Sequence, residues 1–258
     1  MKIAVLGARG FLGKIICNHF ESRGYTVYPI TRLDLDLTDF NAVSDWLNDV
    51  QPDSVVNCAT AMNTDVYDNV YKDIRNNISI FLNFYNNSQY FKKFINVGSG
   101  AEFDRTKNIE SASETDIMRL MPNDSYGFSK NIISRAVLGH DKFYTLRLFG
   151  CFHRSEPNFR LFKRVSKGEA VSIIDKQFDY FSAQDFCTVL DYYVNNQAEY
   201  KDINCVYKEK LYLSQILLKI KPVAIVGKDP LNYTGNGDKL ASLNLPLLGL
   251  EESIKEYK

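Results

Sequence analysis

The sequence predicts an α/β protein built around a doubly wound parallel sheet, with a smaller lobe at its C-terminal end. One observation behind this is a short apolar run at residues 2–6 that leads directly into a glycine-rich loop. Another is the regular alternation of strand-like and helix-like segments as far as residue 150. Strands separated by helical crossovers run parallel in one sheet, and helices cover both of its faces. The 258 residues are enough to bury the core of one large or two small domains.

The predicted elements follow one another in a regular order. After the first strand, apolar residues recur at helical spacing over residues 11–23, which predicts an amphipathic helix. Further strands are predicted at residues 27–30, 53–57, 94–97 and 143–148, and further helices at 40–50, 66–88 and around Tyr126. Beyond Gly150 we predict a strand at residues 171–174, a helix at 184–196 and short elements around Asn204, Ser214 and Val223.

Three glycines, Gly7, Gly10 and Gly13, directly follow the first strand and precede the first helix. In such a loop the first glycine permits a tight turn, the second lets the backbone approach a pyrophosphate, and the third lets the helix pack close to the strand. The phosphates then lie at the positive end of the helix. We therefore interpret residues 1–150 as an NAD(P)-binding Rossmann domain. Residues 151–258 are predicted to form a smaller substrate-binding lobe, parts of which can return to the Rossmann sheet.

Tyr126 and Lys130 form a candidate acid–base pair. Residues four apart lie on the same face of a helix, so the phenol and the ammonium are neighbours. A neighbouring cation favours the phenolate form of a tyrosine, which lets Tyr126 exchange a proton with a hydroxyl or carbonyl group of a sugar. In the alternative interpretation the two side chains only cover a helix face.

The glycine spacing, taken with the sequence Tyr126-Gly127-Phe128-Ser129-Lys130, resembles the extended short-chain dehydrogenase/reductase family. The resemblance is to its NAD(P)-dependent nucleotide-sugar epimerases, dehydratases and reductases, including GDP-fucose synthases and 4-keto-sugar reductases. It extends over nearly the whole chain. Other segments that are similar to those of the family are residues 36–39, 57–61, 94–100, 146–150 and the tail from 238 to 254.

The resemblance implies a catalytic triad of Ser99, Tyr126 and Lys130. Tyr126 would donate a proton to a carbonyl oxygen, Ser99 would hydrogen-bond that oxygen, and Lys130 would orient the nicotinamide ribose. Asn77 is similar to a structural asparagine that opens a helix in the family. The implied cofactor-binding residues are Gly7, Arg9, Gly10, Phe11, Leu12, Gly13, Thr31, Arg32, Asp36, Leu37, Cys58, Ala59, Thr60, Asn77, Tyr126 and Lys130.

Charges near the expected adenosine ribose favour NADP over NAD. Proteins of this fold that bind NAD usually carry an acidic side chain at the end of the second strand. Here that position reads Ile30-Thr31-Arg32, and no carboxylate precedes Arg32. Arg9 lies inside the glycine loop, so two guanidinium groups can converge on a 2′-phosphate. GDP-fucose synthases look similar at both places.

The residues after Ser99 indicate the type of reaction. Gly100 and Ala101 stand where the family's 4,6-dehydratases carry an Asp-Glu pair, and Ala101 aligns with a cysteine that GDP-fucose synthases use for epimerisation. Glu102 is adjacent and is a weak candidate to replace that cysteine. We therefore expect a 4-keto-sugar reductase, with a 4-epimerase as the alternative. A non-catalytic NADP-binding sensor or a structural subunit is the alternative from another class.

The C-terminal lobe specifies a substrate less clearly. Residues 176–185 resemble a family segment in which an arginine grips the substrate diphosphate, but Phe178 stands at the arginine's place. The residues that could replace this cation are Arg154, Arg160, Lys163 and Arg164. We expect a small-molecule sugar substrate that is nucleotide-linked, while the base and the sugar stay open.

Composition excludes several classes. The formal net charge is zero without a basic block, which gives no electrostatic case for nucleic acid. The sequence has no long apolar run and no signal-peptide pattern, so we expect a cytoplasmic protein away from membranes. Five scattered cysteines and three separated histidines favour reduced thiols and no metal site. A homodimer is expected through the helix at 66–88 and the Tyr126 helix, where Ile80, Phe81, Phe84 and Tyr85 supply apolar groups.

Overall fold

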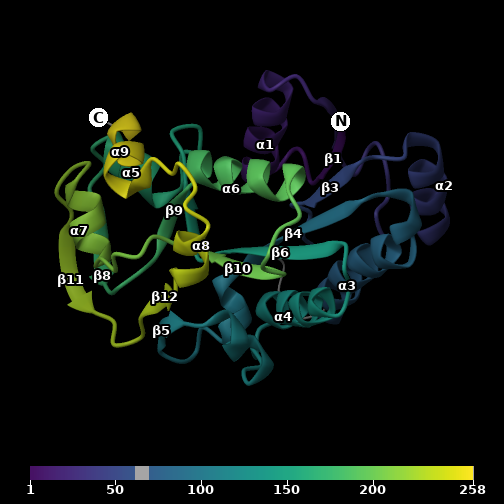
Figure 1. Ribbon diagram of the computed structural model, residues 1–258. Coiled ribbons are helices and arrows are strands. Elements are labelled where there is room, and N and C mark those ends of the chain that lie inside the picture. Colours follow the sequence, from purple (N-terminus) through teal and green to yellow (C-terminus); the bar gives the residue numbers. More distant parts are fainter. Residues whose placement is uncertain (62–69, 258) are drawn as a thin grey trace.

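The computed structural model describes residues 1–61 and 70–257, and it confirms the predicted parallel α/β fold (Figure 1). Six parallel strands form the main sheet in the order β10-β6-β4-β3-β1-β2. Their bounds are β1 (Lys2–Leu6), β2 (Thr26–Ile30), β3 (Ser54–Asn57), β4 (Lys93–Ser99), β6 (Phe143–Leu148) and β10 (Asp202–Cys205). The chain order reverses beside β1, because β2 lies on one side of it and β3 on the other. Ligands of such sheets bind at the carboxyl ends of the strands at this point.

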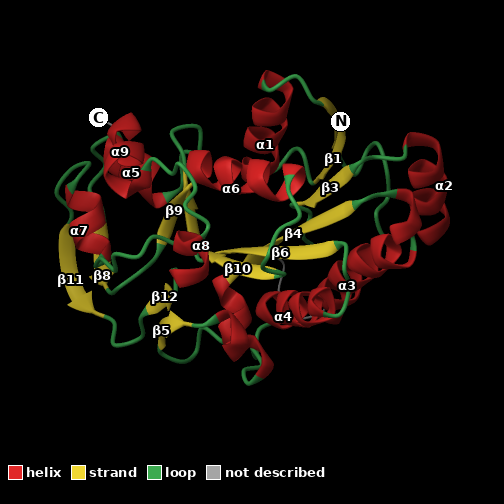
Figure 2. Cartoon of the chain, in the orientation of Figure 1, coloured by secondary structure: helices red, strands yellow, loops and turns green. Residues whose placement is uncertain are grey.

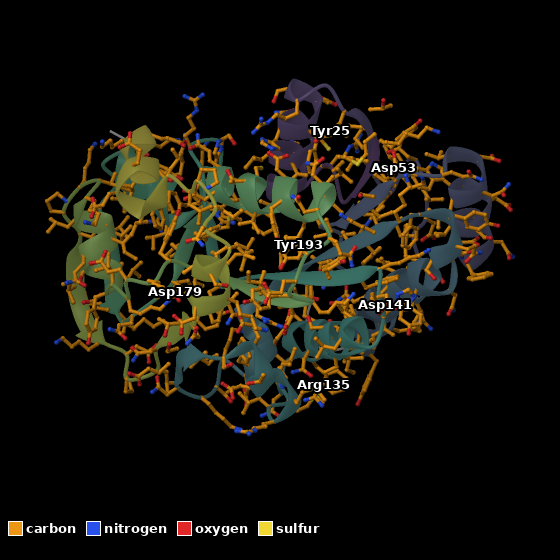
Figure 3. All side chains as sticks on the ribbon, viewed as in Figure 1. Tyr25, Asp53, Arg135, Asp141, Asp179 and Tyr193 are labelled. Carbon is orange, nitrogen blue, oxygen red and sulfur yellow. The ribbon has the colours of Figure 1, made fainter. Side chains whose placement is uncertain are left out.

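Helices cover both faces of the sheet. Figure 1 shows α1 (Phe11–Ser22) and α6 (Ala183–Asn195) on one side, and α3 (Val70–Asn86) and α4 (Ser125–Leu138) on the other, with α2 (Phe40–Val50) beside α3. Because side chains alternate along a strand, Ile3 and Val5 pack under α1, whereas Ala4 and Leu6 pack under α2 and α3. Side chains fill the layer between α6 and the sheet, where the fully buried Tyr193 lies (Figure 3).

The C-terminal lobe has short strands and its own core (Figure 2). Three parallel pairs join β7 (Gly150–Phe152) with β9 (Tyr180–Ser182), β8 (Ser172–Asp175) with β11 (Ala224–Lys228), and β5 (Ile109–Ala112) with β12 (Tyr233–Gly235). Its helices are α5 (Leu161–Ser166), α7 (Leu213–Leu218), α8 (Asp238–Ser242) and α9 (Gly249–Ser253). Four 3₁₀ segments are η1 (Ser88–Tyr90), η2 (Gly100–Phe103), η3 (Glu114–Met118) and η4 (Ile254–Tyr257).

The chain passes between the two parts more than once. α6 and β10 follow residue 150 yet belong to the main sheet and its cover, while β5 precedes residue 150 and pairs with β12. The division at residue 150 stays a prediction. At its carboxyl end β4 pairs with β6 and leads into η2, which contacts β12, so segments from both parts of the sequence meet there.

Most predicted elements agree with the structure to within a few residues. The bounds of α2 and β6 are those predicted, and the structure describes the predicted helix at 66–88 from Val70 to Asn86, with residues 66–69 outside the described part. Strands β5, β7, β9 and β12 were not predicted, since each has only three or four residues. The apolar groups expected at a dimer face serve the core instead: Ile80, Phe81 and Phe84 are 8%, 2% and 0% exposed. Among the described helices, none is long and apolar enough to cross a membrane.

Burial of the thiols predicts that the fold loses stability in alkali. Burial raises the pKa of Cys17 to about 11 and the pKa values of Cys58 and Cys151 to about 12, and it also raises the pKa values of Cys187 and Cys205. Thiols in the unfolded chain ionise near pH 8.5, so above that pH the folded state binds more protons than the unfolded state. The free energy of unfolding should therefore fall as pH rises, by up to about 1.4 kcal/mol per pH unit for each such thiol. Urea unfolding between pH 7 and pH 10.5 tests this, and a constant free energy over that range would contradict it.

Candidate active site

The glycine-rich loop leaves no space for side chains. Gly7 has a φ of +75°, and a Cβ there would lie 2.9 Å from the backbone of Ala59. A Cβ on Gly13 would lie 2.4 Å from the carbonyl oxygen of Gly7, so helix α1 packs directly on the loop. The amides of Gly7 and Ala8 donate to the carbonyl oxygen of Ile30 at 3.0 and 3.1 Å, which fixes the loop to the end of β2. These contacts agree with the predicted roles of the first and third glycines.

A cavity of about 680 Å³ opens beside this loop at the carboxyl ends of β1, β2 and β3. Nine of the predicted cofactor-binding residues line it: Gly7, Gly10, Thr31, Arg32, Asp36, Leu37, Cys58, Ala59 and Thr60. The predicted residues that do not line it are Arg9, Phe11, Leu12, Gly13, Asn77, Tyr126 and Lys130. The structure thus gathers the loop, the end of β2 and the end of β3 around one space.

The cavity carries more charge than the sequence analysis found. Lys72 and Arg75 of α3 line it together with Arg32. The sequence analysis did not predict these two residues, because they lie far from the glycine loop in the sequence. Arg32 lies at the cavity as expected, whereas Arg9 does not. Asp34 was also missed: it folds back and accepts hydrogen bonds from the amide and hydroxyl of Thr31 at 2.9 and 2.6 Å. These bonds, and to a smaller extent Arg9, hold the pKa of Asp34 below its usual range.

Asn77 connects three parts of the site. Its amide oxygen accepts from the backbone amide of Ala61 at 2.6 Å, and its amide nitrogen donates to the carbonyl of Ala61 at 3.1 Å and to the hydroxyl of Ser129 at 3.2 Å. The expectation that Asn77 opens a helix is wrong, because α3 already runs from Val70. The side chain instead bonds the loop after β3 to helix α4.

The predicted triad is brought to the carboxyl end of β4. Ser99 ends that strand and is 8% exposed. Tyr126 lies in the first turn of α4, which begins after Asp124 accepts from the amide of Gly127 at 2.8 Å. The helix packs closely on η2, since a Cβ on Gly127 would lie 2.5 Å from the carbonyl oxygen of Ala101. The buried Lys130 donates to the carbonyl of Val97 on β4 at 2.9 Å.

Tyr233 is a residue of this site that the sequence analysis missed. Its hydroxyl lies near the side chains of Ser99 and Tyr126, and burial raises its pKa. Its ring packs against Phe149 and Phe178, with centroids 5.1 and 4.9 Å apart. The position of Tyr233 depends on the pairing of β12 with β5, and no local sequence pattern around Tyr233 predicts this pairing.

Glu102 cannot take the place of the cysteine of GDP-fucose synthases. Residues 100–103 do not continue β4 but form the 3₁₀ helix η2. The Glu102 side chain is fully buried and ion-paired with Arg147 at 2.6 Å. Ala101 is 1% exposed. At these two positions no side chain is free to move protons to or from a substrate.

Three of the four candidate substrate cations already have partners for their side chains within the lobe. Arg160 donates to Glu156 at 3.0 Å and lies 4.7 Å over the ring of Phe11, which connects the lobe to the glycine loop. Lys163 donates to the carbonyl of Arg154, and Arg164 pairs with Glu169. Arg154 lines a separate cavity of about 600 Å³ between α1 and α6. Phe178 is half-buried and stacks on Tyr180 at 4.6 Å, so an aromatic pair lies where relatives place an arginine.

The network around Asn77 gives a stability prediction. Asn77→Ala removes its hydrogen bonds and leaves the amide and carbonyl of Ala61 without these partners in a buried place. We expect a loss of about 1–3 kcal/mol in the free energy of unfolding, measured by urea denaturation. Asn196→Ala, which removes one exposed hydrogen bond to the carbonyl of Tyr192, should change it by less than about 0.5 kcal/mol. Equal losses in both variants would show that the Asn77 network adds nothing specific.

Comparison with known proteins agrees with this geometry. The family model described as NAD dependent epimerase/dehydratase family matches residues 3–205. No curated protein matches the chain. A Campylobacter jejuni GDP-mannoheptose C4 reductase with NADP bound superimposes with a TM-score of 0.79 at 19% identity, over 99% of this chain and 97% of that one.

Two further solved structures are similar in fold. A GDP-L-fucose synthetase from Naegleria fowleri bound to NADP has a TM-score of 0.78 at 16% identity, over 98% of this chain and 91% of that one. The Bordetella bronchiseptica enzyme WbmG in complex with NAD and UDP has a TM-score of 0.80 at 17% identity, over 99% and 92%. At such identities the likeness shows the fold. The family match covers well over half of the sequence and confirms the predicted kind of enzyme, so the chain belongs to the NAD dependent epimerase/dehydratase family.

Proposed function

We propose that this protein is an NADP-dependent reductase of a 4-keto sugar that is nucleotide-linked. The observation that carries the proposal is the meeting of Ser99 at the end of β4 with the α4 residues Tyr126 and Lys130, on the same edge of the sheet as the glycine-loop cavity. A binding module would have no need for this combination of hydroxyl, phenol and ammonium. The triad therefore favours an enzyme over a non-catalytic NADP-binding sensor or a structural subunit.

The residues present fit a dinucleotide with a 2′-phosphate. Gly10, the second glycine of the loop, lines the cavity without a side chain, which permits the close backbone approach that a pyrophosphate requires. Arg32, Lys72 and Arg75 line the adjoining cavity and can neutralise a phosphate, with Arg9 nearby on the loop. When bound, NADPH supplies the hydride.

The chain's own residues supply the proton and the electrostatic stabilisation. Tyr126 donates its phenolic proton to the carbonyl oxygen as negative charge grows on that atom. The Ser99 hydroxyl already accepts from the amide of Ala101 at 3.2 Å, which leaves its own hydrogen to donate to the same oxygen. Preorganised donors stabilise the transition state more than the ground state, because the charge appears only as the reaction proceeds. Lys130, buried beside β4, holds a positive charge near the reacting centre.

A 4-epimerase that uses NAD is the second candidate. Asp34 favours it, since this carboxylate is bonded to Thr31 at the end of β2, close to where NAD enzymes hold a ribose hydroxyl. Ala101 and the buried Glu102 speak against a 3,5-epimerase, because neither can carry protons to a substrate. The cations lining the cavity favour the reductase.

We propose further that the protein is cytoplasmic and homodimeric. Free cysteines support a reducing compartment. The dimer would use α3 and α4, which pack side by side and expose Leu82 and Leu138. Light scattering at micromolar concentration tests the dimer, and the mass of one 29.6 kDa chain would exclude it.

Tyr126→Phe tests the proton donor. The variant keeps the ring but deletes the proton, so single-turnover oxidation of NADPH with 4-keto nucleotide sugars, followed at 340 nm, should slow by about two to four decades. NADPH affinity and thermal stability should stay near those of the wild type. A rate above about a tenth of wild type would end the catalytic assignment.

Lys130→Met provides the contrast. Because Lys130 is proposed to act on both the phenol and the nicotinamide ribose, this variant should lose turnover and NADPH affinity together. Unchanged affinity would remove the ribose role and leave the electrostatic one.

Arg32→Ala tests cofactor choice. Loss of a charge-assisted contact of about 1.5–3 kcal/mol should weaken NADP binding by roughly one to two decades and leave NAD binding nearly unchanged. Arg164→Ala is the matched control, because Arg164 pairs with Glu169 in the C-terminal lobe and does not line the cavity. This variant should bind both cofactors normally. Equal weakening of NADP and NAD by Arg32→Ala would refute the 2′-phosphate contact.

A further inference from the structure

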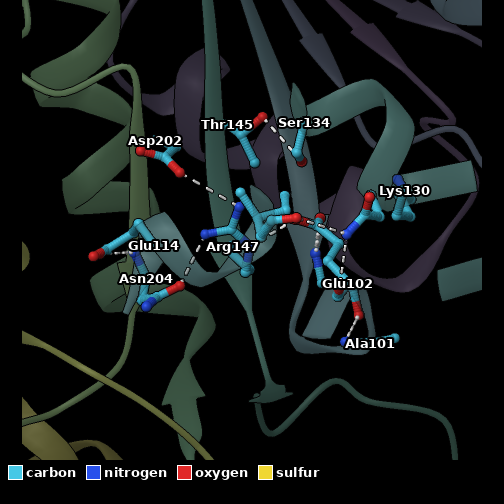
Figure 4. A network of polar contacts seen from close by, with 12 residues as sticks. Ala101, Glu102, Glu114, Lys130, Ser134, Thr145, Arg147, Asp202 and Asn204 are labelled. Atoms are coloured by element: carbon cyan, nitrogen blue, oxygen red, sulfur yellow. Dashed lines mark hydrogen bonds and ion pairs between the residues drawn. The ribbon is translucent and has the colours of Figure 1, made fainter. Parts of the chain in front are cut away.

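A buried ion pair lies directly behind the candidate catalytic serine (Figure 4). The Nε atom of Arg147 donates to Oε2 of Glu102 at 2.6 Å, and both side chains are 0% exposed. Removing two charges from water is costly, and a buried pair often stabilises a fold no better than apolar residues of similar size. The position of this pair therefore calls for an explanation other than stability.

The other carboxylate oxygen of Glu102 holds Ser99. Its Oε1 atom accepts from the backbone amide of Ser99 at 2.8 Å, while the Ser99 hydroxyl accepts from the amide of Ala101. The two bonds form a reciprocal cap at the start of η2. The backbone amide of Ser99 and its Oγ atom are thus both held in place by hydrogen bonds at the end of β4.

The strand beneath leaves the carboxylate little freedom. A Cβ on Gly98 would lie 2.7 Å from Oε1 of Glu102 and 2.6 Å from Cγ2 of Thr145. Glycine at this position therefore makes the room that the Glu102 side chain occupies.

Arg147 is in turn held by the edge strand β10. Its Nη1 atom donates to the amide oxygen of Asn204 at 3.0 Å, and its Nη2 atom lies 3.6 Å from the carboxylate of Asp202. Lys239 of α8 pairs with Asp202 at 3.0 Å. A continuous polar chain thus runs from Lys239 through Asp202, Arg147 and Glu102 to the amide of Ser99. Figure 4 shows its middle part, from Asp202 through Arg147 to Glu102.

We infer that Glu102 is a positioning residue that fixes the orientation of Ser99, and that Arg147 fixes Glu102. This rests on the proposed role of Ser99 as a donor to the substrate oxygen. A carboxylate suits the task because it offers two acceptor oxygens, one for the Ser99 amide and one for Arg147. A glutamine offers one acceptor and one donor, so it can satisfy only one of these two N–H groups.

Glu102→Gln, Ser99→Ala and the double variant form the first test. With NADPH and GDP- and dTDP-linked 4-keto-6-deoxy sugars, Glu102→Gln should slow single-turnover hydride transfer by about 10- to 100-fold and change the dissociation constant of NADPH by less than about twofold. The double variant should be no slower than Ser99→Ala, because residues that act as a unit are not additive. Asp175→Asn is the matched control: Asp175 lies on β8 of the C-terminal lobe, is 6% exposed and accepts from the amide and the hydroxyl of Ser214 at 2.9 and 2.7 Å. It should keep the wild-type rate.

The possible results distinguish the positioning role of Glu102 from the proposed role of Ser99. A slow Ser99→Ala with a fast Glu102→Gln, or with additive losses in the double variant, overturns the positioning role and leaves the proposed function intact. A wild-type rate for Ser99→Ala removes the serine from the proposed function and with it the purpose of the positioning.

A second measurement needs no substrate. In ¹⁵N-labelled protein with NADPH, hydrogen exchange at the Ser99 amide should be slow in the wild type and in Asp175→Asn, and at least about tenfold faster in Glu102→Gln. If Glu102→Gln does not fold, Glu102→Asp keeps the charge but shortens the side chain by one methylene, and it should show the same faster exchange. Unchanged exchange at Ser99 in the folded variant overturns the inference.

Discussion

All strands of the main sheet run in one direction, and the candidate site depends on this constraint. Parallel strands end at the same edge, so the glycine loop after β1, the turn after β2, the loop after β3 and Ser99 at the end of β4 meet there without being close in the sequence. Helix α4 then has only to pack on η2 to add Tyr126 and Lys130 to that edge. The contact at Gly127, where no Cβ would fit, shows how closely the helix approaches.

Two kinds of surface meet at this edge. The nucleotide side is lined by cations from two separate segments, Arg32 after β2 and Lys72 and Arg75 on α3. The lobe side presents aromatic rings instead, with Phe178 stacked on Tyr180 and Tyr233 behind them, while nearby arginines are engaged with glutamates. Under the proposed function, a sugar ring would lie against such rings through its apolar C–H face, and recognition in this lobe would depend on shape more than on charge.

The sequence was sufficient for features with a local pattern and insufficient for those that depend on distant pairing. The glycine loop, α2, β6 and the Tyr126 helix each carry their signal within a few residues, and the structure places them as predicted. Tyr233 reaches Ser99 only because β12 pairs with β5, more than one hundred residues earlier in the chain. Glu102 was misjudged for a related reason: its orientation depends on η2 and on Arg147, which is 45 residues away. Asp34 was missed and Asn77 was misread because side-chain bonds to the backbone, not helix or strand patterns, decide where they point.

The place of β10 at the edge of the main sheet has a consequence for synthesis on the ribosome. The main-sheet strands β1, β2, β3, β4 and β6 can pair as they emerge, since each of them after the first docks beside one already made. Arg147, however, meets Asn204 and Asp202 only after the chain has grown by more than fifty residues, and Lys239 arrives later still. Until then the Arg147 guanidinium has only Glu102 among its polar partners, and its Nη1 and Nη2 atoms lack Asn204 and Asp202. The contacts that hold Arg147, and through it Glu102 and Ser99, are therefore completed late in synthesis, and a chain interrupted before residue 200 lacks the Asn204 and Asp202 partners of Arg147.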